Sequence, residues 1–149
     1  MLLHILRFTS VMATAVAMAA GFAHLLELPA KMKLAPEEYL IVQQIYRGWA
    51  LLGVVIIIAL LSTLVVGVLT RDQPRVALLT LGAATCIALS LVVFFAFTFP
   101  ANRATSNWTI LPDEWAALRR QWEYSHAVGA ALYFVALGCL TLSLLPRRT

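Results

Sequence analysis

Two short motifs near opposite ends of the chain each place a histidine three residues from a glutamate. His24 precedes Glu27 in the first motif, and Glu123 precedes His126 in the second. Residues three apart share one face of a helix, so each motif directs an imidazole and a carboxylate the same way. Ionisable groups are costly inside a membrane and usually serve a function there. These four residues are therefore the first candidates for a functional site.

A transition-metal centre is the first chemistry that these residue types indicate. Glu-x-x-His motifs on facing helices hold di-iron and di-manganese centres in helical bundles. Two histidines with two carboxylates can also hold a single iron, copper, manganese or zinc ion and leave positions open for oxygen or substrate. On this interpretation the metal ligands are His24, Glu27, Glu123 and His126, with molecular oxygen as co-substrate.

Two further chemistries use the same histidines. His24 and His126 could bind one haem from opposite sides, which would give an electron carrier. Alternatively, a histidine beside a glutamate can remove a proton from a carbon acid without any metal. Arg47 or Arg119 would then stabilise the resulting anion.

A purely structural interpretation is a network of salt bridges that fastens the ends of the helices. In such a network Arg47 pairs with Glu27, and Arg119 or Arg120 pairs with Glu123. The histidines then donate to backbone carbonyls, and no catalysis follows.

The composition indicates the environment in which these residues lie. The 149-residue chain is 62% hydrophobic and 12% charged, with a mean hydropathy of +0.87, whereas soluble domains are nearer half apolar and a quarter charged. A helix of about 20 residues crosses the hydrocarbon of a bilayer. Apart from His24, four stretches of that length carry no ionised side chain: 8–26, 48–70, 76–102 and 127–146.

The sequence therefore predicts an all-α protein, an antiparallel bundle of four transmembrane helices that forms one integral membrane domain over residues 1–149. The expected helices span 3–27, 37–70, 76–99 and 113–145. The first should stop before Pro29 and the third at Pro100. Pro36 and Pro112 are each followed by two acidic residues, a typical helix start. The second and fourth helices should therefore begin beyond the membrane on its outer side.

One face of the first expected helix is small or polar. Small residues allow membrane helices to approach closely, so this face should pack against the bundle. The segment also resembles a signal peptide, but we expect it to be retained because His24 and Glu27 lie beyond any plausible cleavage site. The residues of this face are Ser10, Ala13, Thr14, Ala17, Ala20, Gly21, His24 and Glu27.

In an antiparallel bundle, the ends of the first and third helices meet the starts of the second and fourth. This topology adds Arg47, Asn102 and Arg119 to the candidate site, where they would orient a substrate or the ligands. All the expected site residues then lie at one end of the bundle.

The arginines indicate an orientation in the membrane. Arg71, Arg75, Arg147 and Arg148 favour a cytoplasmic location for both termini, which would place the site on the periplasmic side of a bacterial inner membrane. No basic run exceeds two residues, so nucleic acid is not an expected partner. The expected partners are the lipid bilayer and a small lipophilic substrate; the sequence does not indicate an oligomeric state.

Four segments together resemble a known family. They are 24–29 (HLLELP), 43–49 (QQIYRGW), 100–102 (PAN) and 115–126 (WAALRRQWEYSH). The chain resembles the DUF1772, or anthrone oxygenase-like, family of small four-helix membrane proteins over nearly its whole length. The family pattern around Asn102, Arg119, Trp122 and His126 is present, whereas the His24–Glu27 pair resembles a bacterial subset.

This resemblance implies an activity. Fungal members of the family are tied to the oxidation of anthrones to anthraquinones by molecular oxygen. The chain would then be a membrane oxidoreductase, an oxygenase acting on a small quinone- or anthrone-like substrate. The alternative from another class is a non-catalytic protein that binds haem or a metal, or an assembly factor.

Overall fold

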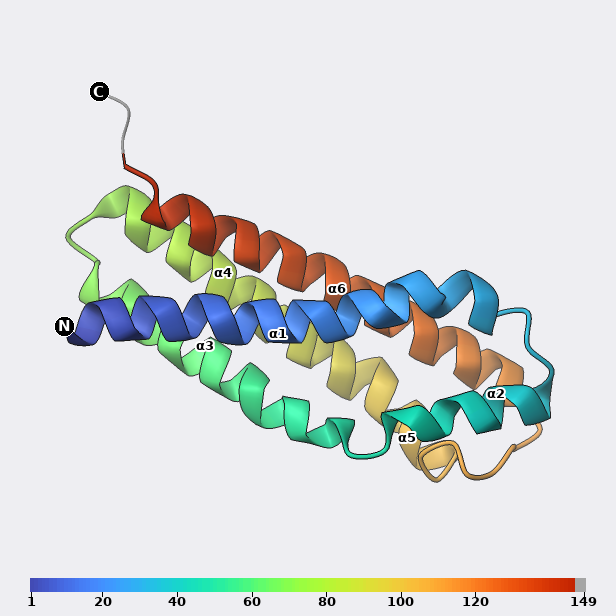
Figure 1. Ribbon diagram of the computed structural model, residues 1–149. Coiled ribbons are helices and arrows are strands. Elements are labelled where there is room, and N and C mark those ends of the chain that lie inside the picture. Colours follow the sequence, from blue (N-terminus) through green and yellow to red (C-terminus); the bar gives the residue numbers. More distant parts are fainter. Residues whose placement is uncertain (147–149) are drawn as a thin grey trace.

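The computed structural model describes residues 1–146, which form an antiparallel bundle of four long helical spans (Figure 1). The first span packs against the second and fourth, and the third packs against the same two. The predicted all-α four-helix bundle is thereby confirmed. The helical segments are α1 (Leu2–Lys31), α2 (Pro36–Gln43), η1 (Gln44–Tyr46), η2 (Trp49–Leu51), α3 (Leu52–Leu69), α4 (Pro74–Val93), the π-helical η3 (Phe94–Thr98), α5 (Phe99–Ala104) and α6 (Trp115–Leu144).

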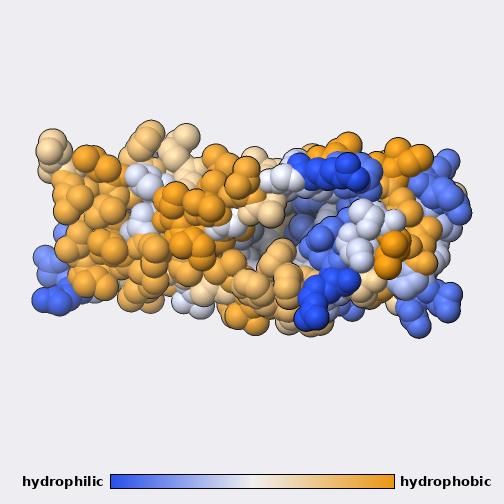
Figure 2. Space-filling view, turned by 90° about the horizontal axis from the view of Figure 1, so that it is seen from below, coloured by the Kyte–Doolittle hydropathy of each residue, from blue (hydrophilic) through white to orange (hydrophobic). Residues whose placement is uncertain are grey.

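All four spans are long and apolar enough to cross a membrane. They cover Leu2–Lys31, Trp49–Leu69, Pro74–Ala104 and Trp115–Leu144. Figure 2 shows that apolar side chains cover most of the length of the visible face, while polar ones gather toward its ends. A soluble protein rarely exposes so large an apolar surface, and the chain is therefore an integral membrane protein.

Small side chains form much of the contact between the spans. Ala17, Ala59, Ala83 and Ala136 are buried at the centre of the bundle. A side chain on Gly21 would come within 3.1 Å of the Cα of Ala130, so α1 and α6 approach closely there. The predicted packing face of the first helix is confirmed by the burial of Ser10, Ala13, Thr14, Ala17 and His24.

The first helix does not stop before Pro29. It continues to Lys31 with Pro29 inside it, so the expected end at residue 27 was wrong. Proline removes one backbone hydrogen bond and crowds the carbonyl four residues earlier. Polar contacts of the last turn offset this cost, because Lys31 is buried and bonded on several sides.

The second span is not the continuous helix expected over 37–70. The helix breaks between Tyr46, the last residue of the 3₁₀ turn η1, and Trp49, the first residue of the 3₁₀ turn η2. Within this break Gly48 has a φ of +87°. Glycine adopts this left-handed conformation without the steric cost that other residues bear. The break separates the extramembrane helix α2 from the spanning helix α3.

The third span continues past Pro100, where the sequence predicted its end. A π-helical turn over Phe94–Thr98 precedes α5, which carries the chain on to Ala104. Pro100 lacks the N–H that would bond back one turn, and a wider turn relieves its clash with the preceding backbone. Asn102 therefore lies on a helix. The fourth helix, Trp115–Leu144, nearly matches its expected span of 113–145.

Candidate functional site

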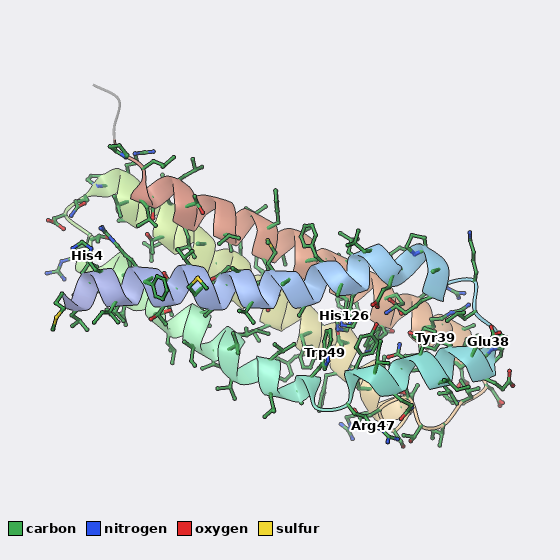
Figure 3. The ribbon with its side chains drawn as sticks, viewed as in Figure 1. His4, Glu38, Tyr39, Arg47, Trp49 and His126 are labelled. Atoms are coloured by element: carbon green, nitrogen blue, oxygen red, sulfur yellow. The ribbon has the colours of Figure 1, made fainter. Side chains whose placement is uncertain are left out.

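The predicted site residues gather where α1 ends and α6 begins, which we call the site end of the bundle. The contact between Gly21 and Ala130 lies about one turn from His24 on α1 and from His126 on α6. It brings the two imidazoles together, with ring centroids 4.2 Å apart. His24 is buried and His126 is half-buried; Figure 3 labels His126 toward the site end of the bundle.

The centre of the site is occupied by a residue that the sequence analysis did not include, Lys31. Its side chain is 3% exposed. The Nζ atom lies 3.1 Å from Oε1 of Glu123 and 3.4 Å from Oε2 of Glu27. It also donates to the hydroxyl of Tyr46 at 3.0 Å and lies 3.4 Å from Nδ1 of His24. A protein ammonium group therefore stands between the carboxylates that were expected to bind a metal.

The metal centre stays a prediction, and the two carboxylates that it would use contact a protein ammonium group in this structure. Within residues 1–146 no group of three or more His, Cys, Asp or Glu side chains is arranged to hold a metal ion. The ammonium group of Lys31 already forms ion pairs with the carboxylates of Glu27 and Glu123. A haem between the histidines does not fit, because metal–imidazole bonds are about 2 Å long on each side and ring centroids 4.2 Å apart leave no space for a porphyrin.

Lys31 contacts two carboxylate–tyrosine pairs. In the closed pair, Tyr39 donates to Oε1 of Glu123 at 2.9 Å, and both side chains are fully buried. In the open pair, Tyr46 donates to Oε2 of Glu27, whose side chain is 39% exposed. The two pairs place identical chemical groups in contrasting surroundings.

Both phenols act as hydrogen-bond donors. Burial chiefly, and then the charge of Glu123, raises the pKa of Tyr39 far above its ordinary value. Burial and the hydrogen bond to Glu27 raise the pKa of Tyr46 in the same way. Each tyrosine therefore keeps its proton at every physiological pH.

Hydrogen bonds assign the protons of the two histidines. Nδ1 of His126 lies 2.9 Å from the carbonyl oxygen of Trp122. A carbonyl only accepts, so this nitrogen carries the proton and Nε2 keeps a free lone pair. Nδ1 of His24 faces the ammonium of Lys31, which only donates, so His24 carries its proton on Nε2. A base and a donor thus lie side by side.

Aromatic rings enclose the two imidazoles. The ring of Trp122 lies 4.0 Å from that of His126 and 5.0 Å from that of His24, and Trp49 lies 5.4 Å from His24. The indole of Trp122 donates to the side-chain oxygen of Asn102 at 2.8 Å. Asn102 therefore orients one of the residues that enclose the imidazoles.

The arginines make different contacts from those expected. Arg119 donates to the carbonyl oxygens of Lys31 at 3.3 Å and Leu34 at 2.9 Å, beyond the end of α1. A cation is favourable at a helix C-terminus, so Arg119 holds the turn that positions Lys31. Arg47 is exposed and lies on the outside of the bundle (Figure 3).

The predicted salt-bridge network was therefore wrong in its partners. Among the described residues, both site carboxylates pair with Lys31, and neither pairs with Arg47, Arg119 or Arg120. Anion stabilisation by Arg47 or Arg119 has no support in these contacts, and the ammonium of Lys31 is the cation at the centre.

An apolar groove of about 410 Å³ lies on the surface where α1 meets the start of the second span. Trp49 lines this groove and also contacts His24, so its indole connects the wall of the groove with one of the imidazoles. The volume falls within the range of small-molecule sites. The groove is lined by Val16, Ala20, Gly48, Trp49, Leu51, Leu52 and Val55.

Sequence reasoning missed three members of the site: Lys31, Tyr39 and Tyr46. A signal existed for Lys31, because it follows His24 by seven residues and Glu27 by four, and this spacing places all three on one helix face. The tyrosines carry no comparable local signal.

Comparisons of the chain with family models, with curated proteins and with solved structures gave no match. The resemblance to the anthrone oxygenase-like family therefore stays a prediction that the four sequence segments carry.

Proposed function

We propose that this protein is a membrane-embedded oxidoreductase that removes a proton from a small lipophilic carbon acid and passes the resulting anion to molecular oxygen. The observation that carries the proposal is the pairing of two imidazoles with complementary protons. The two ring centroids lie 4.2 Å apart, and the hydrogen bonds assign a lone pair to Nε2 of His126 and a proton to Nε2 of His24.

An anthrone-like substrate suits this arrangement. Its C–H between two aromatic rings is acidic enough for an imidazole to remove, and the negative charge moves onto the carbonyl oxygen. His126 takes the proton as general base. His24 donates a hydrogen bond from its Nε2–H to the substrate's carbonyl oxygen. The ammonium of Lys31, which faces the other ring nitrogen, Nδ1, polarises the imidazole of His24.

The oxidation then balances without a metal. The carbanion gives its electrons to molecular oxygen, and a new C–O bond forms. The peroxide takes the proton held by His126 and eliminates water as the second C–H breaks. One anthrone and one oxygen molecule give one anthraquinone and one water.

The apolar groove supports a substrate that arrives from the bilayer. A fused aromatic ring system would contact only apolar side chains and Gly48 there. Trp49 would then be the last residue between the ligand and His24.

For the membrane orientation we propose cytoplasmic termini and a site on the periplasmic side of a bacterial inner membrane. Arg71 and Arg75 lie in or next to the short connection between α3 and α4, at the end opposite the site. Arg147 and Arg148 support the same orientation by sequence but lie outside the described residues.

The test uses the purified protein in lipid nanodiscs supplied with an anthrone, with oxygen consumption and anthraquinone absorbance as readouts. His126→Gln should lower the protein-dependent rate about 10²–10⁴-fold, the usual contribution of a general base. His4→Gln is the matched control, because His4 lies at the opposite end of the bundle (Figure 3). Dialysis against EDTA should leave the rate unchanged. No rate above that of empty nanodiscs, or equal rates in His126→Gln and wild type, would overturn the proposal.

A further inference from the structure

We propose that Tyr46 and Glu27 form a proton path that connects the buried ammonium of Lys31 with water at the site end. The inference rests on the proposed function in one respect: an enclosed acid–base site needs a route by which its protons equilibrate with solvent. The residues of the path have no other role in the mechanism above.

The hydrogen bonds of the open pair all run outward. Lys31 donates to the oxygen of Tyr46 at 3.0 Å, and Tyr46 donates to Oε2 of Glu27. The Glu27 side chain is 39% exposed, and we place it in contact with water because it lies near the end of the first span. When a proton passes from Lys31 to the Tyr46 oxygen, the original hydroxyl proton moves to Glu27, which releases it to solvent. The reverse sequence returns a proton to Lys31, and no other reactant is needed.

The closed pair offers no such route, although it contains the same groups. Lys31 and Tyr39 both donate to the same oxygen of Glu123. Among the described residues no hydrogen bond joins Lys31 to Tyr39, whereas one joins Lys31 to Tyr46, so a proton cannot continue from Lys31 to Tyr39. Tyr39 is also fully buried and has no contact with solvent to which it could pass a proton.

The other groups around Lys31 define the inner end of the path. From α1, Nδ1 of His24 lies 3.4 Å from Nζ. From α6, Glu123 accepts from Lys31, while Arg119 bonds backbone carbonyl oxygens of the α1 terminus. His24 is therefore the imidazole that can exchange a proton with the path through Lys31.

The chain offers a direct test because it contains only two lysines, buried Lys31 and exposed Lys33. The protein is labelled with [¹⁵N]lysine, and NMR measures how fast each ammonium exchanges protons with water. Lys33→Arg assigns the Lys31 signal. Tyr46→Phe should slow the exchange of Lys31 with water about tenfold. This factor corresponds to the free energy of one lost hydrogen bond to a charged group. Glu27→Gln should also slow it, because an amide does not relay protons in this way.

Tyr39→Phe is the matched control, since it also removes a phenolic hydroxyl bonded to a Lys31-paired carboxylate. It should leave the exchange of Lys31 within about twofold of wild type. Unchanged or faster exchange in both Tyr46→Phe and Glu27→Gln overturns the path, as does equal slowing in Tyr39→Phe. The exchange of exposed Lys33 is the internal reference for pH and temperature in every variant, and circular dichroism checks that each variant is folded. The measurement needs no substrate, so loss of the path and loss of the proposed oxidation are separate results.

Discussion

Lys31 joins two carboxylate–tyrosine pairs that are alike in composition and opposite in setting. Glu123 and Tyr39 are sealed inside the bundle, whereas Glu27 and Tyr46 lead to its surface. In both pairs the ammonium and a phenol approach one carboxylate oxygen, but only in the open pair does Lys31 also donate to the phenol oxygen. The difference shows that burial and donor direction, and not residue type, decide what a tyrosine beside a glutamate can do.

The closed pair also depends more strongly on its partners. Among the described residues, Oε2 of Glu123 is buried without a hydrogen-bond partner, so Oε1 makes all the contacts that stabilise this carboxylate. A buried charge that loses its partner is strongly destabilising. The open pair retains solvent as a partner, and loss of one contact there costs less.

The largest effect should come from removing the cation that both pairs share. Lys31→Met leaves Glu123 buried without a counter-charge, and we expect the free energy of unfolding to fall by about 3–5 kcal/mol. Reversible unfolding in mixed micelles, followed by circular dichroism, measures the change.

Lys33→Met is the control for Lys31→Met, and its effect should stay within about 0.5 kcal/mol because Lys33 is exposed. Adding Glu123→Gln to Lys31→Met should restore part of the lost stability by removing the stranded charge. If the double variant is no more stable than Lys31→Met, the assigned cause is wrong.

The next effect separates the two carboxylates. Glu123→Gln should lower the free energy of unfolding by about 2–3 kcal/mol, since it disturbs charged hydrogen bonds in a dry site. Glu27→Gln should cost less than about 1 kcal/mol, because its pair with Lys31 is partly exposed. Equal losses for the two variants, measured in the same unfolding assay, would contradict the distinction between closed and open pairs.

The smallest effect separates the two phenols. Tyr39→Phe removes a buried donor to Glu123 and should cost about 1–2 kcal/mol. Tyr46→Phe should cost about 0.5–1 kcal/mol, because water can replace the lost contact at Glu27. A larger loss of stability in Tyr46→Phe than in Tyr39→Phe would indicate that the open pair is in fact shielded from solvent.

Much of the fold could be predicted from the sequence because uncharged stretches of membrane-spanning length mark the helices. The antiparallel topology then places the two His/Glu motifs at one end. The continuous second helix was wrong because the apolar pattern resumes directly after Gly48, and nothing in that pattern reveals a left-handed residue.

The centre of the site was missed for a specific reason. Pro29 predicts a helix end because an interior proline removes a backbone hydrogen bond and crowds the preceding turn, but α1 continues to Lys31, whose side-chain contacts the sequence does not reveal. Tyr39 and Tyr46 could not be assigned, because their hydroxyls reach Glu123 and Glu27 across separate elements. The charge of Arg119 predicts an ion pair with a carboxylate. Its guanidinium instead lies beside the C-terminus of α1, where it donates to backbone carbonyl oxygens.

The break at Gly48 has a consequence for the depth of the site. The second span retains 21 residues beyond it, a length of about 31 Å at 1.5 Å per residue, which matches a hydrocarbon thickness of about 30 Å. Irregular backbone is not tolerated against lipid tails, so we propose that the break lies at the boundary between acyl chains and headgroups. The imidazole beside Trp49 then lies at this boundary, where an amphiphilic ring compound can keep its oxygen among the headgroups while its hydrocarbon edge stays in the tails.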